Sequence, residues 1–223
     1  MKICHTWIWV IYFILMLYQT TATIPKQCIG WKKHLTNYMV SISQKYPTLI
    51  KGSIGEQAVD LIRFLLPEGS SILEFGCGVT TKLLLNWYNV YSIEHNMNWL
   101  NHPNAYHVPL KQYNDTDFKT PQDISCLPFY EKQVAWYDPD KLSSVLKLVP
   151  KYDLIIVDGP NGNYGRGGFY THLNLFNTDA HIVFHDLNRQ AEMELIKKVS
   201  TKVGRPAFIL DDDEKTGVIK SIN

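Results

Sequence analysis

The chain has 223 residues, 45% of them hydrophobic, and a formal net charge of +1. A chain of this length can bury a full core, so we predict one folded domain over residues 23–223, after an N-terminal segment. A net charge near zero gives no long-range field that would collect a polyanion, which excludes nucleic acid as the expected partner.

The first 22 residues have the pattern of a secretory-pathway leader. Lys2 precedes an apolar run at residues 7–18, and small residues follow at 20–22. We interpret this segment as a cleaved signal peptide. The alternative is an uncleaved, short Golgi-type membrane anchor through residues 7–18, since an ordinary transmembrane helix needs ~20 apolar residues. Both interpretations predict a secretory-pathway protein, either secreted or held in the Golgi lumen or membrane.

Two further features fit a lumenal address. Cys28 and Cys126 are the pair that we expect to form a disulfide, because Cys77 lies in a turn that needs a small side chain. Asn114 begins an N-glycosylation sequon, which a chain that enters the lumen can use. The sequence therefore predicts a glycoprotein.

Predicted helices and strands alternate along the chain. They are a helix at 54–66, a strand at 71–75, a helix at 80–88, strands at 90–94 and 105–110, a helix at 141–149, strands at 152–158 and 180–186, and a helix at 188–203 with Asn188 as its cap. The tail at 207–222 is expected to pair two strands through an acidic turn. This order predicts an α/β fold, a doubly wound Rossmann-like parallel sheet with helices on both faces and an antiparallel C-terminal strand.

Residues 111–140 show no sustained period, and we interpret them as a surface insertion that is a candidate acceptor site. Trp136 lies in this insertion. A tryptophan there is expected in the core or, alternatively, as a platform on which a glycan ring stacks.

The first strand leads into a glycine-rich turn, ILEFGCGVTT. In a doubly wound sheet, ligands bind beyond the carboxyl ends of the strands, where Gly76 and Gly78 would allow a tight turn and a close approach to the backbone. Thr81 stands where a dinucleotide fingerprint has its third glycine. Glu74 would lie beside the pyrophosphate of a dinucleotide but would attract a ligand with a cationic amino-acid portion. S-adenosylmethionine is such a ligand, and an NAD-linked oxidoreductase is the alternative.

Four ordered motifs, LEFGCG, SIEHN, YDLIIVDGP and HIVFHD, resemble those of class I S-adenosylmethionine-dependent methyltransferases over about residues 75–220. The resemblance implies that the methionine portion of the cofactor contacts Glu74, Gly76 and Gly78. Glu94 would accept hydrogen bonds from the ribose, a role that its position twenty residues after Glu74 also favours. Asp158 would border the methyl-transfer site.

A narrower likeness rests on YHVPL, DLIIVDGPNGNYGR and VFHDLNR. These segments resemble plant polysaccharide methyltransferases that 4-O-methylate glucuronic acid on xylan, a Golgi family with short N-terminal anchors. The likeness implies a uronic acid acceptor. We expect residues 161–168 to form a flexible segment whose Arg166 binds the substrate carboxylate bidentately, with an ordinary solvated loop as the alternative.

Asp158 and Asp186 end strands that would be neighbours, so their carboxylates are expected to converge. Two such acids repel unless something lies between them, and a divalent cation with Asn188 as a third ligand would serve. This arrangement resembles catechol O-methyltransferase, which places a lysine base three residues after the first acid, where this chain has Asn161. His185 is therefore the expected base, with Asp158 as the alternative; a purely structural role of His185 and Asp186 is the third reading.

These features together predict a secretory-pathway O-methyltransferase (EC 2.1.1.-) that uses S-adenosylmethionine. Its expected acceptor is a hydroxyl on a glycan or a small molecule. The alternative from another class is a noncatalytic lumenal binding module with a methyltransferase fold.

Overall fold

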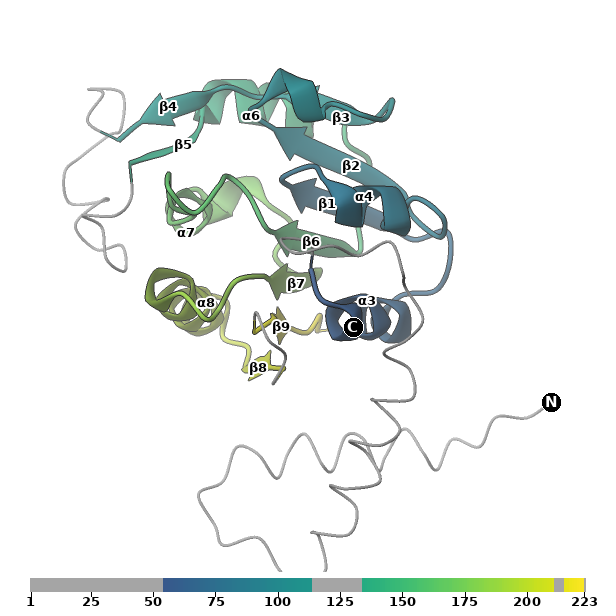
Figure 1. The fold of residues 1–223 in the computed structure, drawn as a ribbon. Helices are drawn as coiled ribbons and strands as arrows, with labels where there is room; N and C mark the ends of the chain where they lie inside the picture. Colours follow the sequence, from purple (N-terminus) through teal and green to yellow (C-terminus); the bar gives the residue numbers. More distant parts are fainter. Residues whose placement is uncertain (1–53, 114–133, 211–214, 223) are drawn as a thin grey trace, which may run out of the picture. The chain divides into compact units, whose positions relative to one another are not determined.

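The computed structural model of the protein describes residues 54–113, 134–210 and 215–222 (Figure 1). Within this part of the chain, no helix is both long and apolar enough to cross a membrane. Four predictions fall on other residues and stay predictions: the leader at 1–22, the disulfide Cys28–Cys126, the sequon at Asn114 and the acidic turn at 211–214.

A seven-stranded sheet forms the centre of the domain, in the order β3-β2-β1-β6-β7-β9-β8 (Figure 1). The strands are β1 (Ser71–Phe75), β2 (Asn89–Glu94), β3 (Ala105–His107), β6 (Leu154–Val157), β7 (His181–Phe184), β8 (Ala207–Ile209) and β9 (Gly217–Ile219). The first five in the spatial order pair in parallel, whereas β9 is antiparallel to both of its neighbours. The predicted doubly wound sheet with an antiparallel C-terminal strand is confirmed.

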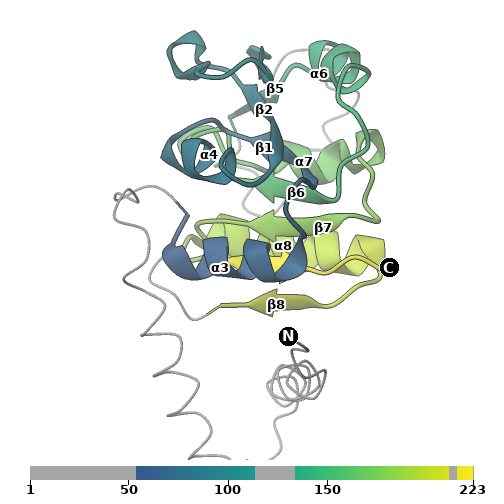
Figure 2. The same cartoon turned by 90° about the vertical axis from the view of Figure 1, so that its right-hand side faces the viewer.

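Helices cover both faces of the sheet, which explains why β6 is buried along its whole length. On one face, α3 (Glu56–Leu65) and α4 (Val79–Leu84) are part of a core that includes Ile72. On the other face, α6 (Pro139–Leu146), α7 (Gly168–Thr171) and α8 (Gln190–Val203) are part of a core that includes Leu73. Figure 2 shows α3 and α4 toward the viewer and α8 behind the sheet.

The segment after β3 differs from the prediction of one strand at 105–110. It contains a separate two-stranded antiparallel sheet of β4 (Leu110–Gln112) and β5 (Ala135–Tyr137). Pro109 separates β3 from β4 because proline has no backbone N–H to donate to a ladder.

Strand β5 returns the end of the insertion to the protein core. Trp136 is fully buried, and its ring lies 5.6 Å from that of Phe75. Of the two readings for Trp136, the core position is therefore confirmed, and the ring has no exposed face on which a glycan could stack.

Helix α8 begins at Gln190, and Arg189 rather than Asn188 is its N-cap. The prediction of an Asn188 cap was wrong. The chain turns first, because the Arg189 N–H donates to the carbonyl of Asp186 at 2.9 Å, and Asn188 is exposed in that turn.

Candidate functional site

The turns after β1 and β6 lie against each other at the carboxyl edge of the sheet. Gly76 has a φ of 92°, and a Cβ added to it would lie 3.2 Å from the Gly159 nitrogen. A Cβ on Gly159 would lie 2.7 Å from the Gly76 nitrogen and 2.6 Å from the Tyr137 hydroxyl. Because neither glycine has room for a side chain, the glycine turn and Asp158 are held side by side.

Gly78 is different, because no atom of the described residues, its chain neighbours aside, lies within 4 Å of the position that its Cβ would take. Its φ of −164° is extended, so conformation does not require glycine there. The open space beside the backbone is what a bound ligand needs, and the predicted contact between Gly78 and a cofactor fits this geometry.

The two residues that favour S-adenosylmethionine over NAD in the sequence contact each other. Thr81 Oγ1 donates to Glu74 Oε2 at 2.7 Å and accepts from the Gly78 N–H at 2.8 Å. Ser92 Oγ on β2 donates to the same Glu74 oxygen at 2.6 Å. Thr81 therefore fixes both the acid and the turn, a function that a third glycine could not perform.

Glu74 is only 3% exposed, and burial raises its pKa to about 8 although the hydrogen bonds from Ser92 and Thr81 act in the opposite direction. The carboxyl group is consequently mostly protonated at pH 7. A positively charged ligand atom beside it would favour the ionised form.

Glu94 joins the turn after β2 to the glycine turn. Its Oε2 accepts from the Cys77 N–H at 3.0 Å, and its Oε1 accepts from the Asn96 N–H at 2.6 Å. The His95 Nδ1 also lies 2.9 Å from Oε1. Oε2, which accepts from one N–H, therefore keeps a lone pair that can accept from a ribose hydroxyl. The backbone bonds orient the acid for that role.

On the other side of the edge, Asp158 follows β6, and His185 and Asp186 follow β7. One ligand atom from each of the three side chains lies within 4.8 Å of the others. The His185 Nδ1 lies 3.0 Å from Asp158 Oδ1, and since an ionised carboxylate only accepts, Nδ1 carries the proton. Asp158 is the most accessible of the three, with 25% of its side chain exposed, against 13% for Asp186 and 2% for His185.

His185 titrates above its usual range. Burial lowers its pKa, but the hydrogen bond to Asp158 and the negative charges of Asp158 and Asp186 outweigh burial, so the net shift is upward. The His185 side chain is only 2% exposed, against 25% for Asp158, so an acceptor hydroxyl would reach the Asp158 carboxylate more easily.

Arg166 lies at the buried end of the segment 161–168, so the alternative of a solvated arginine does not hold, whereas the predicted flexibility of the segment stays a prediction. The guanidinium is 3% exposed, and its Nη2 donates to Asp186 Oδ2 at 2.7 Å and to Asp158 Oδ1 at 3.2 Å. Residues 165–168 are buried, and Gly168 packs against the Trp136 ring, where a Cβ would come within 2.0 Å. The substrate role predicted for Arg166 is untested, but its Nη2 already serves the two acids.

Asp186 has a φ of 62°, a left-handed conformation that is uncommon outside glycine and better tolerated by aspartate. Two arginines hold the residue there: Arg166, and Arg189, whose Nη1 lies 2.9 Å from Asp186 Oδ2. Arg189 is the accessible one, with 46% of its side chain exposed.

The predicted metal site stays a prediction, and the structure places the Arg166 guanidinium against the same two acids. The donor atoms of Asp158, His185 and Asp186 are close enough to share an ion, but the two acids already accept from the Arg166 Nη2. Asn188, the predicted third ligand, is exposed.

Sequence reasoning missed Tyr137, which lies on β5. Its hydroxyl is buried against Gly159, and among the described residues it has no hydrogen-bond partner. Burial raises its pKa well above the usual value. The only available signal was the short apolar run at 135–137, inside a segment without a sustained period.

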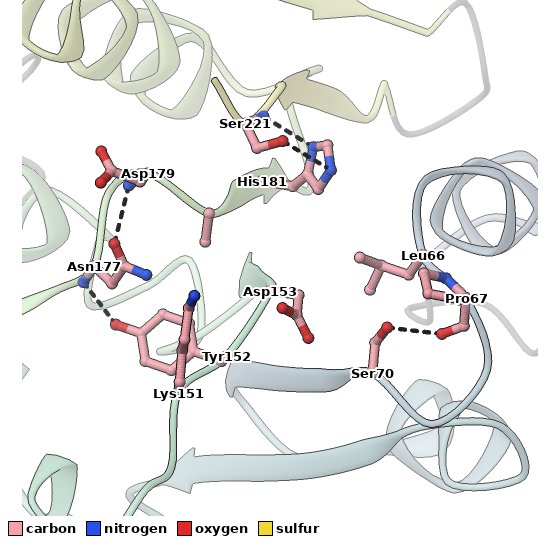
Figure 3. Close-up of a pocket in the computed structure, with 11 residues that line it drawn as sticks. Leu66, Pro67, Ser70, Lys151, Tyr152, Asp153, Asn177, Asp179, His181 and Ser221 are labelled. Atoms are coloured by element: carbon pink, nitrogen blue, oxygen red, sulfur yellow. Dashed lines mark hydrogen bonds between the residues drawn. The ribbon is translucent and has the colours of Figure 1, made fainter. Parts of the chain in front are cut away.

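A separate cavity of about 460 Å³ lies at the opposite, amino-terminal ends of the strands (Figure 3). Its polar groups are engaged with the protein: Asp153 Oδ2 accepts from the Ser71 N–H at 3.0 Å, and His181 Nδ1 accepts from the Ser221 N–H at 3.0 Å. The residues singled out from the sequence lie at the other edge, so this cavity is not part of the candidate site.

No protein-family model matches the chain, and a search of curated proteins finds no match. Solved structures that resemble it include precorrin 8w decarboxylase from Methanobacterium thermoautotrophicum, with 14% identity and a TM-score of 0.46 over 76% of this chain and 91% of the other. A putative caffeoyl-CoA O-methyltransferase from Staphylococcus aureus has 12% identity and a TM-score of 0.40, covering 88% and 98%. A SAH-bound methyltransferase from Podospora anserina has 12% identity and a TM-score of 0.42, covering 100% and 98%.

These identities and TM-scores are low, and it is the strand order, with β9 inserted antiparallel between β7 and β8, that defines the fold. The protein has the Rossmann-like fold of class I methyltransferases.

Proposed function

We propose that the protein is an S-adenosylmethionine-dependent O-methyltransferase of the secretory pathway that acts on a hydroxyl of a glycan or a small molecule. The observation that carries the proposal is the contact between Gly76 and Gly159. It holds the glycine turn, where the methyl donor would bind, against the loop of the accessible Asp158 carboxylate.

The donor side offers groups that match the charge and shape of S-adenosylmethionine. The open backbone at Gly78 admits the ligand, the Glu74 carboxyl would ionise beside its ammonium group, and Glu94 would accept from the ribose hydroxyls. The bound cofactor supplies a methyl group on a sulfonium, which is transferred as a cation equivalent.

On the acceptor side, Asp158 would hold the hydroxyl and take its proton. As the acceptor oxygen bonds to the methyl carbon, the carbon–sulfur bond breaks and its electron pair passes to sulfur. His185 and Arg166 keep Asp158 in place through hydrogen bonds at 3.0 and 3.2 Å. Such fixed positioning of nucleophile and methyl carbon accounts for a large part of the rate in reactions of this kind.

The glycan and the compartment are proposed from the sequence. The leader pattern at 1–22 supports the secretory pathway, and the likeness to glucuronoxylan methyltransferases supports a uronic acid acceptor. Because Arg166 is engaged by the two acids, the accessible Arg189 at the same edge is the better partner for an acceptor carboxylate.

Titration calorimetry with S-adenosylmethionine tests the donor half, and methyl incorporation from labelled cofactor tests the acceptor half. We expect binding and a methylated product in a panel of acidic glycans, phenols and small hydroxyl compounds. Absence of binding at millimolar cofactor would indicate the noncatalytic binding module instead. Binding of NADH in its place would indicate an oxidoreductase.

A further inference from the structure

We propose that Arg166 is a built-in cation that takes the place of a divalent metal ion between Asp158 and Asp186, so that the cluster neither needs nor binds a metal. The Arg166 Nη2 is the atom that both acids share, at 3.2 Å from Asp158 Oδ1 and 2.7 Å from Asp186 Oδ2. Two carboxylates that converge in this way need a positive charge between them, and the guanidinium provides it.

The guanidinium is fixed on several sides. Besides the two acids, its Nη1 donates to the His185 carbonyl at 3.0 Å and its Nε to the Pro160 carbonyl at 3.3 Å. Arginine keeps its charge at all ordinary pH values, so this cation cannot be removed by titration. It ties together the loops that follow β6 and β7, which are the two loops that carry the acids.

The charges around the cluster leave no demand for a dication. Arg166 and Arg189 both contact Asp186, so the two acids face two guanidinium groups. Glu192, also buried nearby, has a raised pKa because burial outweighs the attraction of Arg166 and Arg189. A metal ion placed between the acids would lie within a few ångströms of the Arg166 guanidinium, and the two like charges would repel strongly in this poorly solvated place.

Cation binding tests this inference independently of the proposed function, because the measurement needs neither a methyl donor nor an acceptor. The full wild-type chain is titrated with Mn²⁺ by calorimetry, and thermal unfolding is followed with and without 1 mM Mn²⁺, a concentration of about 100 times a Kd of 10 µM. We expect no saturable site that depends on Asp158 or Asp186, and no shift in Tm.

Removal of the guanidinium should create the metal site. We expect Arg166→Met to lose thermal stability, and Mn²⁺ to restore it by ~5 °C or more, because the ion replaces the missing charge. A second substitution, Asp158→Asn, should abolish this rescue. Arg189→Met is the matched control: it removes the other cation on Asp186 but leaves Arg166 in place, so Mn²⁺ should not change its Tm.

Two results would overturn the inference. The first is a wild-type chain that binds one equivalent of Mn²⁺ in a manner that Asp158→Asn abolishes. The second is an Arg166→Met chain that Mn²⁺ neither binds nor stabilises. If Arg166→Met does not fold in either condition, Arg166→Gln, which keeps part of the hydrogen bonding, replaces it, and a folded Arg166→Gln chain that Mn²⁺ neither binds nor stabilises overturns the inference.

Discussion

The two sides of the carboxyl edge hold their buried acids in different ways. On the β1–β2 side, Glu74 accepts hydrogen bonds from the hydroxyls of Thr81 and Ser92, and Glu94 accepts them from backbone N–H groups. These hydroxyl and amide donors are neutral, and the His95 Nδ1 also lies 2.9 Å from Glu94 Oε1. Burial raises the pKa of Glu74 to about 8, and a positive charge placed beside it would favour its ionised form.

The β6–β7 side carries its own positive charge. Asp158 and Asp186 share the guanidinium of Arg166, and Arg189 adds a second one at the surface. The two sides therefore differ in their guanidinium groups: the acids after β6 and β7 contact Arg166 and Arg189, whereas Glu74 is held by hydroxyl groups. Under the proposed function, the β1–β2 side would bind the cationic methyl donor and the β6–β7 side the hydroxyl acceptor.

The largest expected effect comes from Asp158→Asn, which removes the accessible base. We expect methyl incorporation to fall by about 10²–10⁴-fold, the usual contribution of a positioned acid or base. Binding of S-adenosylmethionine should change little, because the donor side is intact. The exposed Asp179, at the opposite edge, gives the control variant Asp179→Asn. Full activity of the Asp158 variant would move the base to another residue.

Glu74 should make stability depend on pH on the donor side. Its folded pKa is about 8, against a reference value of 4.5, so the folded chain binds this proton more tightly than the unfolded chain. The stability that the proton contributes is complete below pH 4.5 and is lost as the pH rises through 8. Between pH 5 and pH 8 the loss should be about 3–4 kcal/mol.

The free energy of unfolding is measured with denaturant at pH 5 and pH 8 for wild type and for Glu74→Gln. Subtracting the change in the variant from the change in wild type removes the contributions of the other titrating groups. The variant keeps an oxygen for Thr81 and Ser92 but has no proton to lose, so its curve should be flatter. Ionisation beside a cationic ligand also predicts that wild type binds S-adenosylmethionine more tightly as the pH rises toward 8. Parallel stability curves for the two chains would show that Glu74 is not buried as the structure has it.

Substitutions in the two glycine turns test two different properties: Gly159→Ala tests packing of the fold, and Gly78→Ala tests access of a ligand to the backbone. Gly159→Ala should destabilise the fold by about 1–3 kcal/mol, since its Cβ would meet the backbone nitrogen of Gly76 at 2.7 Å. Gly78→Ala should change stability by less than about 0.5 kcal/mol, because the space there is open. It should nevertheless weaken S-adenosylmethionine binding by about tenfold, or about 1.4 kcal/mol. Unchanged affinity in a folded Gly78 variant would place the ligand elsewhere.

Arg189 gives the smallest expected effect. Arg189→Met should raise the KM for an acidic acceptor by about five- to tenfold and leave the KM for its methyl ester unchanged. An exposed ion pair contributes little, so stability should change by less than about 1 kcal/mol. Lys197→Met, which removes an exposed cation from the same helix, is the control. Equal changes with both acceptors would rule out recognition of the carboxylate.

Much of the fold follows from local patterns. The strand predicted at 71–75 matches β1 residue for residue, and the other parallel strands lie within the predicted ranges apart from one residue at the start of β2. Continuous apolar runs identify these strands because both faces are covered by helices. The insertion was harder, since β5 is three residues long and is recognisable only by the partners that bury it.

The candidate site likewise contains residues that could be predicted from the sequence and residues that could not. The acids at the strand ends could be placed from the sequence, because parallel strands bring their carboxyl ends to one edge. The partners of these acids could not, since Thr81 reaches Glu74 across a tight turn and Tyr137 reaches Gly159 from another sheet. Such contacts depend on the path of each loop and not on any period of the sequence.

The sequence by itself determined the order of the elements, the glycine turn and the four acids that face the carboxyl edge, since hydrophobic periodicity and turn residues act over a few neighbours. Only the tertiary structure decided what neutralises those acids. Arg166 reads in the sequence as one cation in a glycine-rich loop, free to reach a substrate or solvent. Residues 165–168 are buried where Gly168 packs against Trp136, and the guanidinium contacts Asp158 and Asp186, the place for which the sequence alone suggested a metal ion.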